Sequence, residues 1–159
     1  MPQTSERLDE MARIADLLDR AGDGDAWHGP SLTALLADIP AKRAAAHPIP
    51  GAHSIWELVR HIAVWERVVA RRLGGERVEP TTEEDWPPVP APTTGAWKRD
   101  VDDLQRARGE LRGALLAFDE RRLDERVPGR DHSYYVMAHG AVQHDLYHAG
   151  QIAILKRAG

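Results

Sequence analysis

Apolar residues recur at helical spacing in four long stretches of this chain, with polar residues between them. The stretches run from Ser5 to Ala21, from Ile55 to Leu73, from about Ala96 to Phe118 and from about Ser133 to Lys156. In each stretch, apolar residues at three- and four-residue intervals line up on one side of a helix. The pattern therefore predicts four long helices.

The second of these helices has the clearest start signal. Ser54-Ile55-Trp56-Glu57 fits the S-x-x-E capping box, in which the two polar side chains satisfy free N–H groups at a helix start. We therefore interpret Glu57 first as the capping partner of Ser54. The glycine pair Gly74-Gly75 ends the helix.

Two proline-containing segments connect the predicted helices. Residues 27–51 hold four prolines around a short helical piece, Ser31 to Asp38, and read as an ordered connector. Residues Glu76 to Gly95 hold five of the eleven prolines and no apolar period, which predicts an extended linker across the bundle. Trp86 lies in this linker, and we interpret it as an anchor that packs on the helices.

These elements predict an all-α fold, a four-helix bundle in one domain that spans residues 1–159. Alternating β-branched runs and hairpin signals are missing from the sequence. An extended linker of this length reaches about 60 Å, twice the roughly 30 Å of a 20-residue helix. The second and third helices can therefore run parallel, which predicts an up-down-down-up order.

The composition of the chain excludes several classes of function. Hydrophobic residues make up 42% and charged residues 29% of the 159 residues, and the net charge is -4, so nucleic acid is not expected as the main ligand. No apolar run is long enough for a membrane span and no signal peptide is recognisable, so we expect a cytoplasmic protein that does not bind membranes. Cysteine is absent, which excludes disulfides, thiolate metal sites and a cysteine nucleophile. A metal site would need nitrogen and oxygen ligands.

Three of the eight histidines point toward the predicted core. His144 and His148 lie one turn apart on one face of the last helix, and His61 lies beside the apolar stripe of the second helix. If these helices are antiparallel, His61 lies at a height of about 10 Å and the other two at about 12 to 18 Å from the same end. The antiparallel arrangement therefore brings the three imidazoles together.

Two interpretations of this cluster remain open. The imidazoles are either hydrogen-bonded core residues or the ligands of a metal ion, which would satisfy ring nitrogens that are costly to bury unpaired.

We expect surface or capping roles for four of the other histidines: His28, His47, His53 and His132. His139 falls on the opposite side of the last helix, which is apolar on two faces. Either the connector 27–51 or a second subunit covers that other face, and we predict a homodimer.

Two segments together resemble the DinB-like superfamily, also described as YfiT-like metalloenzymes. Residues 140–152, Gly-Ala-Val-Gln-His-Asp-Leu-Tyr-His-Ala-Gly-Gln-Ile, are similar to the last-helix signature of that family. Residues 53–61, His-Ser-Ile-Trp-Glu-Leu-Val-Arg-His, are similar to its second-helix segment with the remaining histidine. The similarity extends over essentially the whole chain, including the long linker.

The resemblance implies an up-down-down-up bundle, often a homodimer, with one divalent ion held by His61, His144 and His148. Zinc or nickel is the expected ion, with iron and manganese as alternatives. Relatives in this family include bacillithiol transferases and mycothiol-dependent maleylpyruvate isomerase. The resemblance thus implies a metal-dependent transferase that uses a low-molecular-weight thiol and acts on a small-molecule substrate.

Three neutral ligands leave an ion its full charge and an open position, which is typical of a catalytic site. The first hypothesis is thiol transfer, and the second is hydrolysis by a bound hydroxide with Glu57 as general base. The third is a metal-binding scaffold without catalysis. Gln151 is interpreted as a supporting residue behind the ligands and Tyr147 as a pocket hydroxyl. Asp145 is expected to be a surface charge.

Overall fold

The computed structural model describes residues 9–158. The secondary-structure elements in this range are all helices, and none is a β-strand. Four helices are long: α1 (Glu10–Gly22), α4 (Ile55–Leu73), α6 (Thr94–Ala117) and α7 (Tyr134–Arg157). They correspond to the four stretches of helical periodicity. The all-α prediction is therefore confirmed.

Capping side chains define the helix starts. In α4, Ser54 Oγ accepts a hydrogen bond from the Glu57 backbone N–H at 3.1 Å, and the Glu57 carboxylate accepts one from the Ser54 N–H at 2.6 Å. This is the predicted capping box. Asp9 caps α1, whose first residue is Glu10; the predicted residues Ser5 to Leu8 lie outside the described range.

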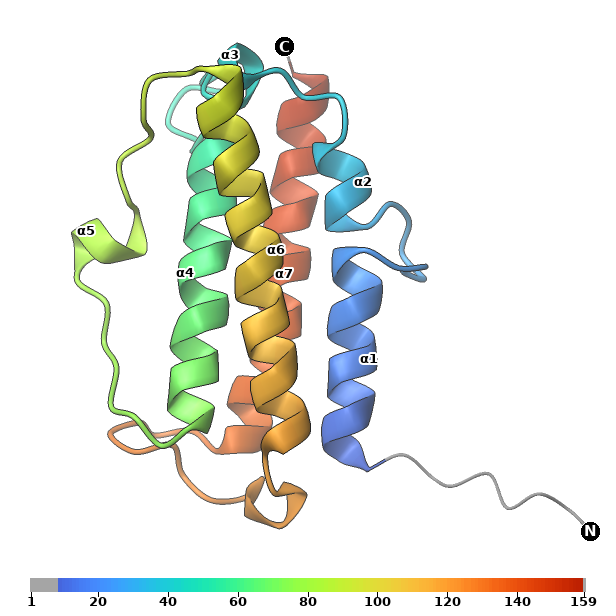
Figure 1. Ribbon diagram of the computed structural model, residues 1–159, viewed down its shortest axis with the longest axis vertical. Coiled ribbons are helices and arrows are strands. Elements are labelled where there is room, and N and C mark those ends of the chain that lie inside the picture. The colour runs from blue at the N-terminus through green and yellow to red at the C-terminus, as the bar shows by residue number, and fades with distance from the viewer. Residues whose placement is uncertain (1–8, 159) are drawn as a thin grey trace, which may run out of the picture.

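Figure 1 shows the four long helices side by side, with α1 and α7 rising in the view and α4 and α6 descending. The long segment between α4 and α6 returns along the outside of α4 from its lower to its upper end. This return allows two consecutive long helices to point the same way.

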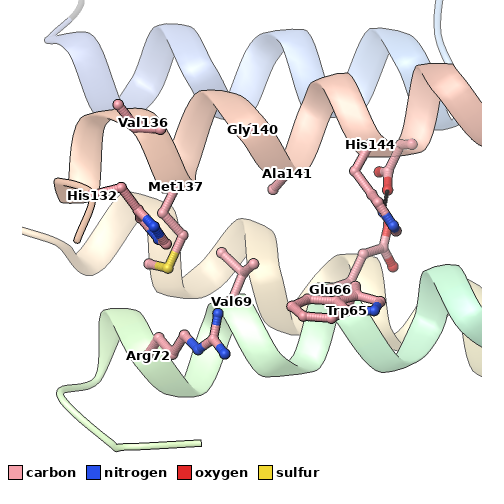
Figure 2. Close-up of a pocket in the computed structure, with 11 residues that line it drawn as sticks. Trp65, Glu66, Val69, Arg72, His132, Val136, Met137, Gly140, Ala141 and His144 are labelled. Atoms are coloured by element: carbon pink, nitrogen blue, oxygen red, sulfur yellow. Dashed lines mark ion pairs between the residues drawn. The ribbon is translucent and has the colours of Figure 1, made fainter. Parts of the chain in front are cut away.

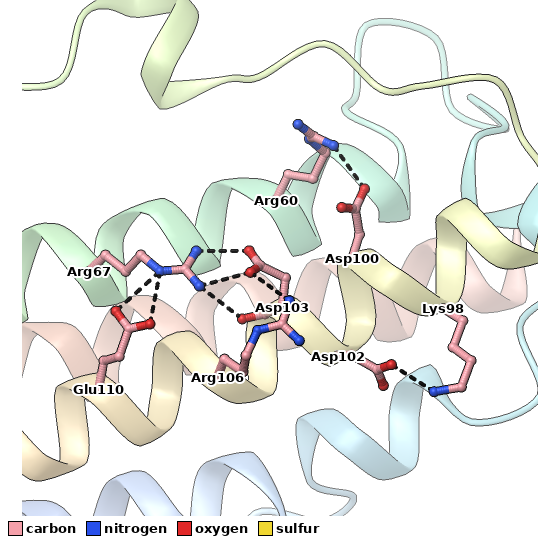
Figure 3. Close-up of polar contacts among 8 residues, drawn as sticks. All are labelled: Arg60, Arg67, Lys98, Asp100, Asp102, Asp103, Arg106 and Glu110. Atoms are coloured by element: carbon pink, nitrogen blue, oxygen red, sulfur yellow. Dashed lines mark hydrogen bonds and ion pairs between the residues drawn. The ribbon is translucent and has the colours of Figure 1, made fainter.

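Ion pairs between α4 and α6 follow this parallel direction (Figure 3). Arg60 pairs with Asp100 at 2.8 Å, and two turns later Arg67 pairs with Asp103 at 2.8 Å and with Glu110 at 3.2 Å. Position therefore increases along both helices together. These pairs are partly exposed, so each contributes at most about 1 kcal/mol to stability and chiefly fixes the register of the two helices.

The segment between α4 and α6 departs from the prediction of an extended linker. It contains a short helix, α5 (Thr82–Asp85). Thr81 and Glu84 form a second capping box, with Glu84 Oε2 accepting from the Thr81 N–H at 2.8 Å. The prediction relied on the prolines of this segment and did not take the T-x-x-E pattern into account. The two capping side chains satisfy free N–H groups at the start of α5, which stabilises this single helical turn.

The connector 27–51 contains α2 (Leu32–Leu36) and α3 (Ala41–Ala44), in place of one predicted piece, and the helix η1 (Glu120–Arg122) follows α6. α2 packs on α7, and Lys156 Nζ donates to the carbonyl of Leu35 at 2.9 Å. The connector thus covers part of the second face of α7. None of the described helices is both long and apolar enough to cross a membrane.

The buried core divides into two apolar clusters along the bundle. Ile62 of α4, Ala107 of α6 and Ala149 of α7 belong to one cluster, which also contains Trp56 and Trp97, whose rings are tilted by 56° with centroids 5.1 Å apart. The other cluster contains residues one to two turns away on the same helices: Val69, Leu111 and Val142. A layer of buried polar and charged side chains lies at positions between or next to these residues on the same helices: His61, Glu66, Arg108, Asp145 and His148.

Candidate metal centre

Three histidine side chains converge between α4 and α7. His61 comes from α4, and His144 and His148 lie one turn apart on α7. The Nε2 atom of His144 lies 3.1 Å from Nε2 of His61 and 3.0 Å from Nε2 of His148. His61 and His148 are buried, whereas His144 is partly exposed. The structure therefore places together the three histidines that the sequence singled out, with His144 at the accessible edge.

The other ring nitrogen of two of these histidines faces a hydrogen-bond acceptor. Nδ1 of His61 lies 3.0 Å from the backbone oxygen of Asp85 and 2.9 Å from its Oδ1. Nδ1 of His148 lies 2.6 Å from Oε1 of Gln151. Because these oxygens accept hydrogen bonds, we assign the ring proton to Nδ1 in both residues. Their Nε2 atoms then carry lone pairs directed at His144.

This arrangement fits a divalent cation. His144 can donate a proton to only one of the two lone pairs that face it, so one nitrogen would stay unsatisfied in a purely hydrogen-bonded cluster. Nitrogen ligands about 2.0–2.1 Å from a shared zinc ion lie about 3 to 3.4 Å apart, which matches the two Nε2 distances. The residues His61, His144 and His148 could hold a metal ion.

The environment favours the neutral form of two of the ligands, His148 and His61. Burial lowers the pKa of His148 to about 4, and the nearby imidazoles of His144 and His61 act in the same direction. Burial also lowers the pKa of His61. A neutral imidazole is the form that binds a metal, so protons compete weakly for these two ligands at neutral pH.

The segment that crosses the outside of α4 contributes directly to the site. Asp85, at the end of α5, accepts from Trp65 Nε1 at 2.6 Å with the same Oδ1 that faces His61. Trp86 stacks on the rings of His61 and His53 with centroid distances of 3.9 and 3.6 Å. Trp86 is thus an anchor, as predicted, but it anchors on a candidate ligand.

Glu57 lies in a different polar group. Its Oε2 accepts from the Ser54 N–H and lies 2.9 Å from His47 Nε2 and 3.5 Å from His53 Nδ1. These contacts and the capping hydrogen bond hold the pKa of Glu57 below its ordinary value, although burial opposes them. They describe a helix cap, which is the first of the two interpretations of Glu57.

Gln151 and Tyr147 occupy different positions. The Gln151 side chain supports His148 from behind, as described above. Tyr147 is 67% exposed, and its ring meets the His148 ring edge-on at a centroid distance of 5.1 Å. Tyr147 therefore lies at the outer rim of the site.

The prediction that Asp145 is a surface charge is wrong, because Asp145 is 4% exposed. It lies in the buried polar layer with Glu66 and Arg108, where Glu66 Oε1 accepts from Arg108 Nε at 3.2 Å. Asp145 lies about 100° around α7 from His144. Both residues line the same cavity between α4 and α7, so this side of α7 is interior and not exposed.

The carboxyl groups of Glu66 and Asp145 share this layer. Burial, and then the charge of Asp145, raise the pKa of Glu66 well above its ordinary value. Two adjacent buried carboxylates do not readily both ionise, so this environment favours the protonated form of Glu66. Glu66 Oε2 and Asp145 Oδ2 are buried and have no hydrogen-bond partner within the described part of the chain. Asp145 Oδ1 lies 3.9 Å from Nδ1 of His144, beyond hydrogen-bond range.

A cavity of about 250 Å³ between α4 and α7 adjoins one of the three histidines, His144 (Figure 2). His144 and Trp65 lie at one end of it, and Arg72 and His132 lie at the other. His132 was expected at the surface or in a cap; it is partly buried and lines this cavity. The cavity gives His144 a neighbouring space for a small molecule.

The family model described as DinB superfamily matches residues 26–152, which include the three histidines and the whole segment between α4 and α6. No curated protein and no solved structure matches the chain.

Proposed function

Because the chain belongs to the DinB superfamily, we propose that it is a metal-dependent transferase that uses a low-molecular-weight thiol. One divalent ion, zinc or nickel, is held by His61, His144 and His148. The observation that carries the proposal is the convergence of three Nε2 atoms, two of them with lone pairs directed at the third.

The donor set supports catalysis more than a structural role. Three neutral imidazoles leave an ion its full positive charge and leave a coordination position for a reactant, whereas structural sites are usually closed by four protein ligands. When bound, the ion would supply an electrophilic centre that keeps a thiol deprotonated at neutral pH.

The surrounding residues have supporting roles in this proposal. Asp85 and Gln151 fix the tautomer and the orientation of His61 and His148 through their Nδ1 atoms. Trp86 covers one face of His61 and excludes water from it. The cavity beside His144 holds the second reactant next to the ligands.

Hydrolysis is the less favoured alternative. The hypothesis assigned the general base to Glu57, whose carboxylate is instead engaged by the Ser54 N–H and His47. A non-catalytic scaffold would bind metal through the same histidines. It would differ from the proposed transferase only in that it catalyses no reaction.

We also propose that the long helices form the up-down-down-up bundle and that the protein is a homodimer. The outer face of α7 supports the second proposal, since Val136, Tyr147 and Ile154 share one side of the helix and are 54%, 67% and 61% exposed. A second copy would cover these apolar side chains.

Thiol transfer is tested by incubating the metal-loaded protein with bacillithiol, mycothiol or glutathione and monochlorobimane. In this reaction the thiolate sulfur forms a bond to carbon as the carbon–chlorine bond breaks, and chloride and a proton leave. We expect bimane fluorescence to rise with metal-loaded protein and not with the His144→Ala variant. Turnover of ester substrates without any thiol would favour the hydrolase, and metal binding without turnover on either panel would favour the scaffold.

A further inference from the structure

The end of the cavity opposite the histidines contains a buried positive charge. Arg72, in the last turn of α4, lines this end, and its side chain is 5% exposed. Nε and Nη2 donate to the carbonyl oxygen of Val78 at 3.1 and 2.8 Å, and the guanidinium lies over the Trp65 ring at 5.5 Å. Nη1 has no hydrogen-bond partner among the described residues.

The charge of Arg72 is only partly compensated. Among the ion pairs of residues 9–158, Glu79 is the one carboxylate on Arg72, at 3.4 Å, and it is 67% exposed. Glu79 also pairs with Arg130, so one carboxylate serves two guanidinium groups. Burial, and then the repulsion from Arg130, lower the pKa of Arg72. This end of the cavity therefore favours an additional negative charge.

Between Arg72 and His144 the cavity is mainly apolar. Its sides include Trp65 and Val69 from α4 and Met137 and Ala141 from α7 (Figure 2). Glu66 and Asp145 also line the cavity, so its acidic side chains belong to the buried layer near His144 and not to the Arg72 end. Seven residues of α4 separate its two ends, which corresponds to about 10 Å. The volume of about 250 Å³ is below the roughly 300–1,000 Å³ of pockets for drug-sized ligands. The shape fits one small molecule with an apolar body.

Gly140 keeps one side of this cavity open. It lies within α7, where glycine costs about 1 kcal/mol relative to alanine. A Cβ atom at this position would meet nothing within 4 Å, so no close packing requires the glycine. The missing side chain leaves space beside the cavity that a larger residue would fill.

We propose that this cavity binds a small organic carboxylate, with its carboxylate on Arg72, its apolar body against Trp65 and Met137, and its other end beside His144. The two guanidinium groups of Arg72 and Arg130 and the one carboxylate of Glu79 together carry one excess positive charge. The carboxylate of the bound molecule would neutralise it. The inference rests on the proposed function, because it assigns the class of the second substrate at that site. It also orients that substrate, with its uncharged end toward the histidines.

Binding is tested on metal-free protein by isothermal titration with hydrocinnamate and with its uncharged amide. Removing the metal prevents the carboxylate from binding to the ion instead. We expect the carboxylate to bind about 10- to 100-fold more tightly than the amide, as a charge-assisted hydrogen bond allows. Equal affinity of the two probes, or no binding of either at millimolar concentration, would overturn the proposal.

Three variants locate the site. Arg72→Gln should remove the preference for the carboxylate and leave amide binding unchanged, and Arg72→Lys should keep part of the preference. Arg71→Gln is the matched control, because it makes the same charge change on a neighbouring side chain that is 57% exposed and paired with Glu76. Gly140→Leu should weaken both probes by filling the cavity, which tests the proposal even if Arg72→Gln fails to fold. Unchanged binding in Gly140→Leu would overturn it.

A zinc titration of the same samples separates this proposal from the proposed function. If zinc binds to the wild type and the probes do not discriminate, the cavity proposal fails and the metal centre stands. If the carboxylate binds with the expected preference but zinc does not bind, the proposed function fails and the cavity proposal stands.

Discussion

Asp85 Oδ1 lies 2.9 Å from Nδ1 of His61, although Asp85 belongs to the segment that joins α4 to α6 and not to a long helix. The same oxygen accepts a hydrogen bond from Trp65 Nε1 at 2.6 Å. The Asp85 side chain thus ties the crossing segment to a candidate metal ligand and to the residue one turn after it. A carboxylate in this position makes the opposite nitrogen a stronger ligand.

Replacing Asp85 with alanine should lower zinc affinity by roughly tenfold, at the low end of the 10- to 100-fold range for such partners. The effect is at the low end because the Asp85 backbone oxygen, 3.0 Å from His61 Nδ1, remains in the variant. Competition titration with a chromophoric chelator measures the change. Glu83→Ala, on an exposed neighbour in α5, is the control. Equal zinc affinity in Asp85→Ala and Glu83→Ala would show that Asp85 has no supporting role.

Arg108, in the buried polar layer, packs against Gly22 at the end of α1, so substitution of this glycine should change the stability of the fold. A Cβ atom there would lie 2.3 Å from Nη1 of Arg108, whose side chain is buried and paired with Glu66. Gly22→Ala should therefore lower the free energy of unfolding by about 1 to 3 kcal/mol, as overpacking does. Urea denaturation measures this change.

Gly113→Ala provides the matched comparison in α6. A Cβ atom at Gly113 meets nothing within 4 Å, and the position is exposed. Alanine should raise the free energy of unfolding there by about 0.5 to 1 kcal/mol through helix propensity alone. If both alanine variants are stabilised alike, Arg108 is not packed against Gly22 as described.

Acid should destabilise the metal-free protein through His148. Its pKa is lowered to about 4 in the folded state, from about 6.5 when unfolded. Between these values the unfolded state binds more protons, so the free energy of unfolding falls as the pH falls. The stabilising effect of neutral His148 is complete above about pH 6.5 and is lost by about pH 4, a loss of roughly 2 to 3 kcal/mol.

Urea unfolding of metal-free protein at several pH values between about 7 and about 4.5 checks this expectation. His148→Gln lacks the titrating group and should show a shallower decline over that range. A variant that loses as much stability as the wild type would indicate that His148 is not buried as a neutral side chain.

The long helices and the histidine cluster could be predicted from the sequence because local patterns determine them. The Ser54 and Glu57 capping box fixed the start of α4, and the i, i+4 spacing of His144 and His148 fixed their common face. Both signals depend on residues close in the chain. The position of His61 followed from one further assumption, an antiparallel pair of helices, which sets the height of each side chain.

Other parts of the site depend on contacts that local patterns do not encode. Asp85 reaches His61 only because the crossing segment folds back along α4 and forms α5. Asp145 is buried because it lies in a polar layer with Glu66 of α4 and Arg108 of α6, which are distant in the sequence. A helical wheel describes one helix, so it cannot show which of two buried faces has polar partners.

The central claim is that His61, His144 and His148 together bind one metal ion. The most direct test is elemental analysis of untagged protein and of the His61→Ala, His144→Ala, His148→Ala triple variant, each after reconstitution with zinc or nickel and removal of excess ion. We predict about one equivalent in the wild type and none in the variant. Equal metal content in the two proteins, whether one equivalent or none, would contradict the claim.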